Sequence, residues 1–181
     1  MAAIRHDQVV ADQPRTAQWV AEFGRAEVAR RFLQTTFRSF WGQFGWMGVV
    51  MDGRVYWALA VYSVGLVMGI LPKDWRLKAS LQSSVSSPQL ESQLLLLISG
   101  FVTLALYLYY NLTYVQHQGR YLFPALIPLG LAAAIGLSGW SRVLSRLARR
   151  NIGWVVGAGA LAGMAALDIF ALYRFVLPAL R

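Results

Sequence analysis

The sequence contains no cysteine and only two histidines. The absence of cysteine excludes disulfides and thiolate metal sites, and it carries no information about the redox compartment. His117 has no companion ligands at a suitable spacing, so the sequence predicts no metal site. No cofactor is expected either.

Acidic residues are also scarce, because eight Asp and Glu stand against seventeen Lys and Arg, which gives a net charge of +9. Such a balance can indicate nucleic-acid binding. Here, however, the basic residues flank long apolar runs, as they do beside membrane-spanning helices that contact anionic head groups. We therefore expect membrane lipids as partners, and we expect no nucleic acid.

Apolar residues, by contrast, are abundant: 57% of the chain is hydrophobic, above the ~45–50% of an ordinary soluble domain. Four runs are long enough to cross a hydrocarbon core of ~30 Å as helices. They cover residues 55–71, 94–115, 121–137 and 152–173. The expected fold is all-α, an integral membrane helical bundle with about four transmembrane helices in residues 54–181. The expected localisation is the cell membrane, with a multi-pass topology.

Two other regions precede this membrane domain. Residues 1–18 are polar and mixed in charge, which is typical of a flexible tail. Within residues 19–53, aromatic side chains recur at steps of three and four and predict an amphipathic helix, and a Trp/Gly-rich stretch that follows predicts an interfacial segment. The helix either lies on a membrane surface, or it packs on the rest of the protein or is the end of a longer helix.

The basic residues give a weak preference for one orientation. With four antiparallel spans, the connections 73–93 and 138–151 lie on one side and carry seven Lys and Arg, against five near the opposite ends. The positive-inside rule then places these two connections in the cytoplasm. The short connection between the central spans, with Arg120, is placed outside.

Polar residues follow one another along the second span at steps of four, three and four, which aligns them on one helical face. They are Tyr107, Asn111, Tyr114 and Gln118. Arg120 and Tyr121 come next, at the expected membrane surface. One hypothesis is a groove for a lipid-linked substrate, in which Arg120 binds the phosphate and Gln118, Tyr121, Tyr114 and Asn111 complete the site. The alternative is that the stripe satisfies itself between helices while Arg120 extends to head groups.

Asp168 is the one acidic residue within an apolar run. It precedes Arg174 by six positions, so it lies ~9 Å below the expected interface, on the same side as Arg120. We expect a structural ion pair between Asp168 and Arg120. A catalytic base at Asp168 is the alternative.

Two blocks of sequence resemble a known family. The block Tyr-Asn-Leu-Thr-Tyr-Val-Gln-His-Gln-Gly-Arg-Tyr-Leu-Phe-Pro-Ala-Leu-Ile-Pro at residues 110–128 is similar to a late membrane-spanning region of bacterial membrane proteins catalogued as domain of unknown function 2142. The block Phe-Arg-Ser-Phe-Trp-Gly-Gln-Phe-Gly-Trp-Met at residues 37–47 resembles a second signature of that family. The family is itself similar to GT-C glycosyltransferases, which use polyprenyl-phosphate sugars.

This resemblance implies that the chain is the carboxyl-terminal part of a glycosyltransferase-like protein of envelope polysaccharide or glycolipid assembly. The catalytic acid that those enzymes keep in an early external loop has no counterpart here, so the chain is not expected to be catalytic alone. A partner membrane chain is one source of the missing acid. The rival interpretation is a non-catalytic membrane scaffold or partner-binding subunit. Glycine pairs such as Gly65/Gly69 and Gly159/Gly163 are spaced for close helix contact in either case.

Overall fold

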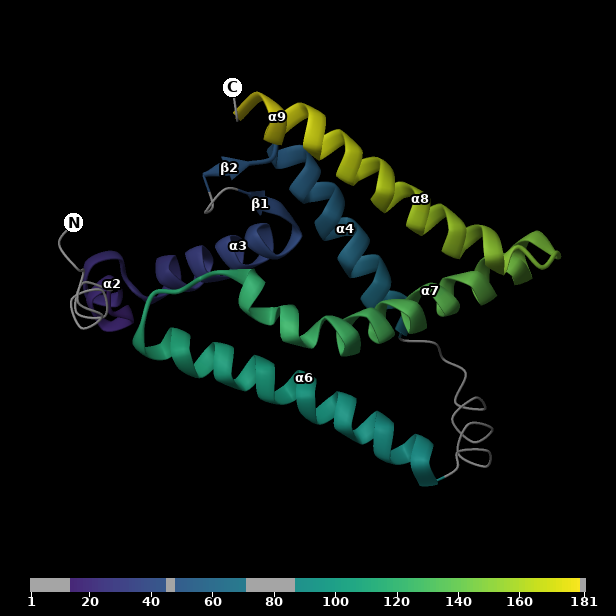
Figure 1. Cartoon of the computed structure of the whole chain (residues 1–181), viewed down its shortest axis with the longest axis horizontal. Coiled ribbons are helices and arrows are strands. Elements are labelled where there is room, and N and C mark those ends of the chain that lie inside the picture. The colour runs from purple at the N-terminus through teal and green to yellow at the C-terminus, as the bar shows by residue number, and fades with distance from the viewer. Residues whose placement is uncertain (1–13, 45–47, 71–86, 180–181) are drawn as a thin grey trace, which may run out of the picture.

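The computed structural model describes residues 14–44, 48–70 and 87–179, and this part of the chain is almost entirely helical (Figure 1). The predicted all-α class is confirmed. In chain order the elements are α2 (Thr16–Phe23), α3 (Arg25–Gly42), β1 (Gln43–Phe44), β2 (Val49–Val50), α4 (Gly53–Ile70), α6 (Ser87–Thr113), the 3-10 helix η1 (Gly119–Ala125), α7 (Leu126–Ala148), α8 (Gly153–Ala171), the π-helical η2 (Leu172–Val176) and α9 (Leu177–Ala179).

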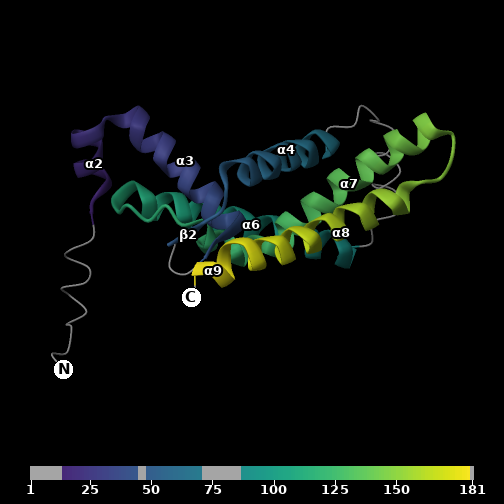
Figure 2. The same cartoon turned by 90° about the horizontal axis from the view of Figure 1, so that it is seen from above.

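Four helical stretches are long and apolar enough to cross a membrane, so the chain is a multi-pass membrane protein. They cover residues 53–70, 91–113, 119–148 and 153–179. In Figure 1, α6 runs from the lower right to the left, near α2, and α7 runs from the centre to the α7–α8 turn at the right, while α4 and α8 both have one end at the top of the view beside β2 and α9. Figure 2 shows the same arrangement from above, with an elongated outline.

The third span differs most from its predicted bounds of 121–137. It starts as the 3-10 helix η1, and α7 then continues to Ala148 through a segment predicted to be a connection. The Ser and Arg residues after position 137 are compatible with a helix that continues out of the hydrocarbon core. Their polarity therefore indicates where the helix reaches the membrane surface, and not where the helix ends. The helix ends where Arg149 takes a left-handed conformation with φ of 51°.

Helices α4 and α7 approach each other through glycines. An added Cβ at Gly136 would collide with the Leu66 carbonyl, and one at Gly139 would collide with the Gly69 carbonyl. Beside this crossing the Trp140 indole donates a hydrogen bond of 2.7 Å to the Gly65 carbonyl oxygen. The backbones are therefore in direct contact, as is common where small residues line membrane helix interfaces.

The predicted 19–53 region consists of two helices and a small hairpin. Gly24, at φ of 82°, separates α2 from α3, and α3 leads into antiparallel β1 and β2. Within α3, hydrogen bonds from Arg30 and Arg31 lower the pKa of the Glu27 carboxyl to about 2. Arg31 also crosses the corner, because its guanidinium carbon lies 4.2 Å from the ring centre of Phe23 in α2. Helix α3 packs on η1 and so contacts the rest of the protein. Of the predicted 1–18 tail, residues 1–13 lie outside the described residues, and α2 already begins at Thr16.

A small core joins the hairpin to the carboxyl end of α8. It is formed by Met51, Tyr56, Leu59 and Ala171, with Phe37, Trp41, Val55, Leu167 and Phe175 packed around it. The Tyr56 hydroxyl donates to the Gly42 carbonyl at 2.8 Å and accepts from the Met51 amide at 3.3 Å, so one side chain closes the base of the hairpin.

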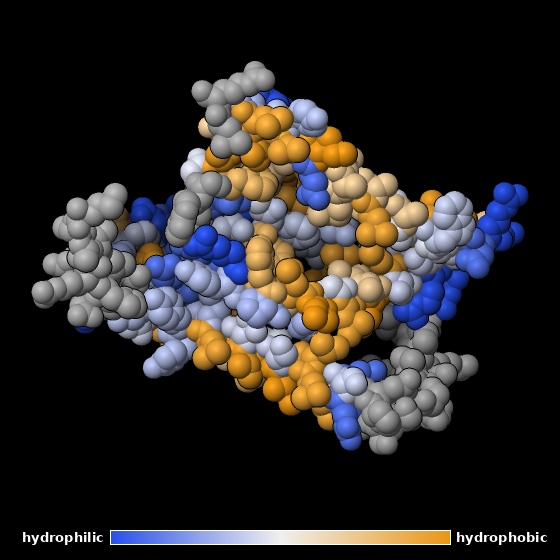
Figure 3. Space-filling model, in the orientation of Figure 1, coloured by the Kyte–Doolittle hydropathy of each residue, from blue (hydrophilic) through white to orange (hydrophobic). Residues whose placement is uncertain are grey.

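Most large apolar side chains of the spans face outward. Phe101 is 72% exposed and Leu161 is 75% exposed, values that suit a lipid solvent and not water. Figure 3 shows the pattern on one face, where hydrophobic residues fill the middle and hydrophilic residues gather toward the two ends. Such a band bounded by polar ends is what a bilayer requires.

Candidate functional site

The connection between α6 and η1 is an extended segment, residues 114–118, held by the amino-terminal part of the described chain. The Val115 amide donates to the Pro14 carbonyl at 3.0 Å, and the Thr16 hydroxyl donates to the Asn111 carbonyl at 2.7 Å. The second bond satisfies a backbone acceptor that the end of α6 leaves open. Because α6 ends at Thr113, Gln118 does not continue the helical face, and the predicted stripe is corrected at this point.

Asn111 is buried and uses its side-chain amide within the chain. Its Nδ2 donates to the Tyr107 carbonyl at 2.9 Å, and its Oδ1 accepts from the Gln116 amide at 3.2 Å. Gln118 donates through Nε2 to Gln116 Oε1 at 3.3 Å. Its own Oε1 is buried and lacks a hydrogen-bond partner within the described ranges. The side-chain amides of Asn111 and Gln118 therefore stabilise the connection by contacts within it, and neither residue lines a groove.

Gly119 is the closest contact between this connection and α3. Its amide donates to the Ser39 hydroxyl at 2.6 Å, and that hydroxyl donates in turn to the Thr35 carbonyl, also at 2.6 Å. A Cβ at position 119 would meet the Thr36 carbonyl oxygen and the Phe40 backbone nitrogen, the latter at 2.6 Å. Only glycine fits here, and its fixed position determines where Arg120 and Tyr121 stand.

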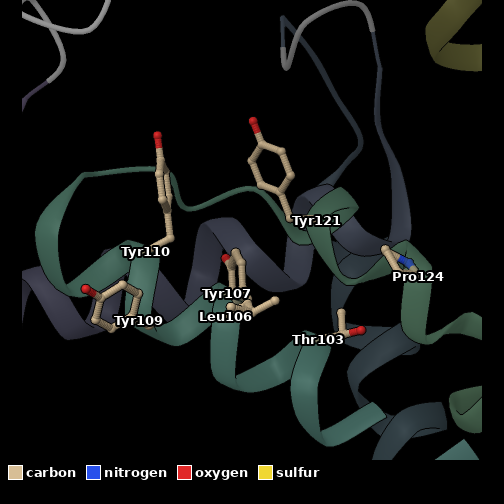
Figure 4. A pocket seen from close by; sticks show the side chains of 7 residues that line it. All are labelled: Thr103, Leu106, Tyr107, Tyr109, Tyr110, Tyr121 and Pro124. Carbon is tan, nitrogen blue, oxygen red and sulfur yellow. The ribbon is translucent and has the colours of Figure 1, made fainter. Parts of the chain in front are cut away.

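An open groove of about 540 Å³ lies between the end of α6 and η1. We name it the tyrosine groove, and its lining consists of Thr103, Leu106, Tyr107, Tyr109, Tyr110, Tyr121 and Pro124. Figure 4 shows the rings of Tyr110 and Tyr121 standing side by side with both hydroxyls directed the same way, away from Leu106 and Thr103. The groove thus has one end marked by phenol hydroxyls and one apolar end.

Further contacts hold two of the groove's tyrosines in place. The Tyr107 hydroxyl shares a hydrogen bond of 2.6 Å with the Thr36 hydroxyl, which ties the floor of the groove to α3. The Tyr114 ring lies against Tyr110 at a centroid distance of 5.3 Å, so it supports the groove from behind without lining it.

Arg120 lies beside the tyrosine groove, next to the ring of Tyr121, and is not one of the seven residues that line the groove. Its guanidinium carbon is 5.6 Å from the ring centre of Tyr121, within the range of a cation–π contact. Of the predicted site residues, Tyr121 lines the groove, and Arg120 contacts Tyr121 from beside it. Tyr114, Asn111 and Gln118 form its support.

Asp168 lies three residues before the end of α8, and its side chain is exposed. The neighbouring residue, Leu167, packs on the Met51–Tyr56 core, so this part of α8 is fixed beside the hairpin. The ion pair between Asp168 and Arg120 stays a prediction.

His117 is buried between aromatic rings in the same connection. Its ring centre is 5.8 Å from that of Trp19 and 5.3 Å from that of Phe32, both in edge-to-face orientation. Burial lowers the pKa of the imidazole below its ordinary value of 6.5, so the ring is neutral at pH 7. Its role is to pack α2 and α3 against the connection. In the part of the chain that the structure describes, no three acidic or histidine side chains are grouped to hold a metal ion.

Several residues of the site escaped the sequence reasoning. The run Tyr-Leu-Tyr-Tyr at 107–110 does signal an aromatic surface, and reading all three rings would have found Tyr109 and Tyr110. Thr36 and Ser39 gave no such signal, because their contacts with Tyr107 and Gly119 span 71 and 80 positions.

Comparisons with protein-family models, with curated proteins and with solved structures find no match to this chain. The resemblance of residues 37–47 and 110–128 to the bacterial membrane family therefore stays a prediction.

Proposed function

We propose that the tyrosine groove binds a lipid-linked anionic substrate of the polyprenyl-phosphate class, with Arg120 at the phosphate. The observation that carries this proposal is the position of a guanidinium beside an open, mainly apolar groove that ends in tyrosine hydroxyls. The chain would then be the lipid-side portion of a glycosyltransferase-like protein of the cell membrane. Its place would be in envelope polysaccharide or glycolipid assembly.

The chemistry of the groove supports an amphiphile with one chain and one charged head. At one end of the groove, the side chains of Leu106, Thr103 and Pro124 form a surface against which a hydrocarbon chain can pack. At the other end, phenol hydroxyls donate hydrogen bonds and an arginine supplies a permanent charge with several N–H donors. Hydrogen bonds from a charged donor to phosphate contribute about 1.5–3 kcal/mol each.

The groove supplies no carboxylate for acid–base chemistry. None of the seven residues that line it is acidic. Transfer of a sugar needs a group that accepts or donates a proton at the reacting oxygen. We therefore assign binding to this chain, and we assign any catalysis to a full-length protein or a partner membrane chain that provides the acid.

The test compares a polyprenyl phosphate with the polyprenol of the same length in detergent-solubilised protein. Since only the phosphate can use Arg120, we expect it to bind at least roughly tenfold more tightly than the alcohol. Arg120→Gln should reduce that ratio to about one while leaving the affinity for the alcohol unchanged. Arg54→Gln, which removes an exposed arginine at the start of α4, serves as the charge-matched control and should keep the full ratio.

Two results would count against the proposal. If Arg120→Gln keeps the preference for phosphate, the guanidinium does not bind the head group. If Tyr110→Ala and Tyr121→Ala bind the alcohol as well as the unchanged protein does, the lipid chain does not lie in the groove. In either case a partner-binding membrane scaffold becomes the better account of the chain.

A further inference from the structure

Four of the exposed Trp and Tyr residues of the last two spans mark two belts. Tyr121 and Trp140 lie nineteen positions apart on η1 and α7, and Trp154 and Tyr173 lie nineteen positions apart on α8 and η2. At helical rise this separation is about 28 Å, close to the ~30 Å of a hydrocarbon core. All four rings are exposed, as interfacial Trp and Tyr are. We call Tyr121 and Tyr173 the tyrosine belt, and Trp140 and Trp154 the tryptophan belt.

The two belts fix how far the chain extends beyond the membrane on one side. Residues 141–152, the α7–α8 tip, lie past the tryptophan belt at the end of the molecule opposite α2 and α3 (Figure 1). Ser141 and Ser145 hold the tip together, because Ser141 Oγ donates to the Gly153 carbonyl at 3.1 Å and Ser145 Oγ accepts from the Ile152 amide at 3.2 Å. The tip is therefore a closed turn at the level of the lipid head groups.

The tip combines four arginines with an exposed apolar side chain. The arginines are Arg142, Arg146, Arg149 and Arg150. Leu147, between them, is 76% exposed. A cation near the carboxyl end of a helix also stabilises the helix dipole, but that effect is limited to the last turn and does not extend to Arg142. Apolar and basic side chains together suit the boundary between head groups and acyl chains of an anionic bilayer.

We propose that the α7–α8 tip is a binding site for the head groups of anionic phospholipids. Arg142 and Arg146 stand one helical turn apart on the same face of α7, shortly after Trp140. The Arg142 Nε donates to the Ser138 carbonyl at 3.2 Å, and its other guanidinium N–H groups are the donors that a phosphate would use. Two arginines at this spacing can bind one phosphate jointly or two neighbouring head groups. This site lies on the other side of the membrane from Arg120, and it does not depend on the function proposed for the tyrosine groove.

The lack of cysteine makes a local measurement possible. A fluorophore attached to a single Leu147→Cys residue reports on the lipids beside the tip. The protein is reconstituted in bilayers of phosphatidylcholine with one quarter phosphatidylglycerol. Trace amounts of either lipid carry a nitroxide quencher near the head-group end of one acyl chain. The ratio of quenching by the two labelled lipids measures the local preference for the anionic one.

We expect labelled phosphatidylglycerol to quench roughly fivefold or more above labelled phosphatidylcholine, since each basic residue at a membrane surface contributes about 1 kcal/mol. Arg142→Gln/Arg146→Gln should bring the ratio close to one. Arg25→Gln/Arg54→Gln removes the same charge from exposed positions at the opposite end and should leave the ratio unchanged.

The proposal is overturned by a ratio near one in the unchanged tip, by a ratio that survives Arg142→Gln/Arg146→Gln, or by an equal loss in the control variant. If the double variant fails to fold, the dependence of the quenching ratio on salt concentration is measured instead, in the protein with the unchanged tip. Raising ionic strength from about 0.05 M to about 0.5 M should then lower the ratio, and a ratio independent of salt contradicts the proposal.

Discussion

Gly136→Ala is expected to destabilise the protein by about 3 kcal/mol or more, toward the upper end of the range for overpacked contacts. The added methyl group would collide with the Leu66 carbonyl oxygen and would lie 3.0 Å from the Leu66 carbonyl carbon. Backbone atoms of a helix cannot rotate away as a side chain can, so α4 and α7 must separate. The two helices would then lose the neighbouring contact between Gly139 and the Gly69 carbonyl as well.

The measurement is an unfolding titration in mixed micelles, followed by the loss of helical circular dichroism. Gly130→Ala is the matched control, because it introduces the same methyl group in α7 at a position with nothing within 4 Å. We expect this control to be neutral or to stabilise by up to about 1 kcal/mol, since alanine favours a helix over glycine. Equal stability of the two variants would show that α4 and α7 do not cross as the structure has them.

Gly119→Ala is expected to disrupt the candidate site and to destabilise the fold, also by about 3 kcal/mol. Its Cβ would meet the Thr36 carbonyl oxygen and would lie 2.6 Å from the backbone nitrogen of Phe40, so η1 must move away from α3. The movement breaks the bond from the Gly119 amide to Ser39 and displaces Arg120, the next residue. The preference for polyprenyl phosphate over polyprenol should therefore fall together with stability.

Ser39→Ala measures the effect of losing the hydrogen bond alone, without the steric collision that Gly119→Ala introduces. This variant leaves a buried amide without its acceptor, which costs about 1–3 kcal/mol, but it creates no overlap. We expect it to be less destabilised than Gly119→Ala and to keep most of the phosphate preference. If Gly119→Ala were the milder of the two, the close packing of η1 on α3 would be wrong.

The membrane domain could be predicted from the sequence because the bilayer imposes strong and local constraints. A span must be a helix of about twenty apolar residues, and that requirement is visible in any window of the chain. The end of α7 was missed because a helix that leaves the hydrocarbon needs no apolar residues, and nothing local stops it before Arg149. The break after α6 was predicted two residues late, at 115, and Gln118 was wrongly placed on the helical face, because the extended course of residues 114–118 depends on bonds to Pro14 and Thr16.

The charged and aromatic residues at the candidate site could be predicted from the sequence, but the shape of the groove could not. Arg120 and Tyr121 stand out in sequence, since a charge between two apolar runs must lie at the surface. The groove itself arises because Ser39 and Thr36 of α3 hold Gly119 and Tyr107. Contacts over such separations follow from the packing of the whole chain, which no short pattern encodes.

The most direct test of the central claim is photo-crosslinking with a polyprenyl phosphate that carries a photoreactive group next to the phosphate. Peptide mapping of the labelled protein shows which residues lie beside the head group. We predict that label appears in the segments 107–110 and 119–124, and that excess unlabelled polyprenyl phosphate removes it. Label concentrated on α8, or label that excess unlabelled lipid does not reduce, would contradict the assignment of the tyrosine groove.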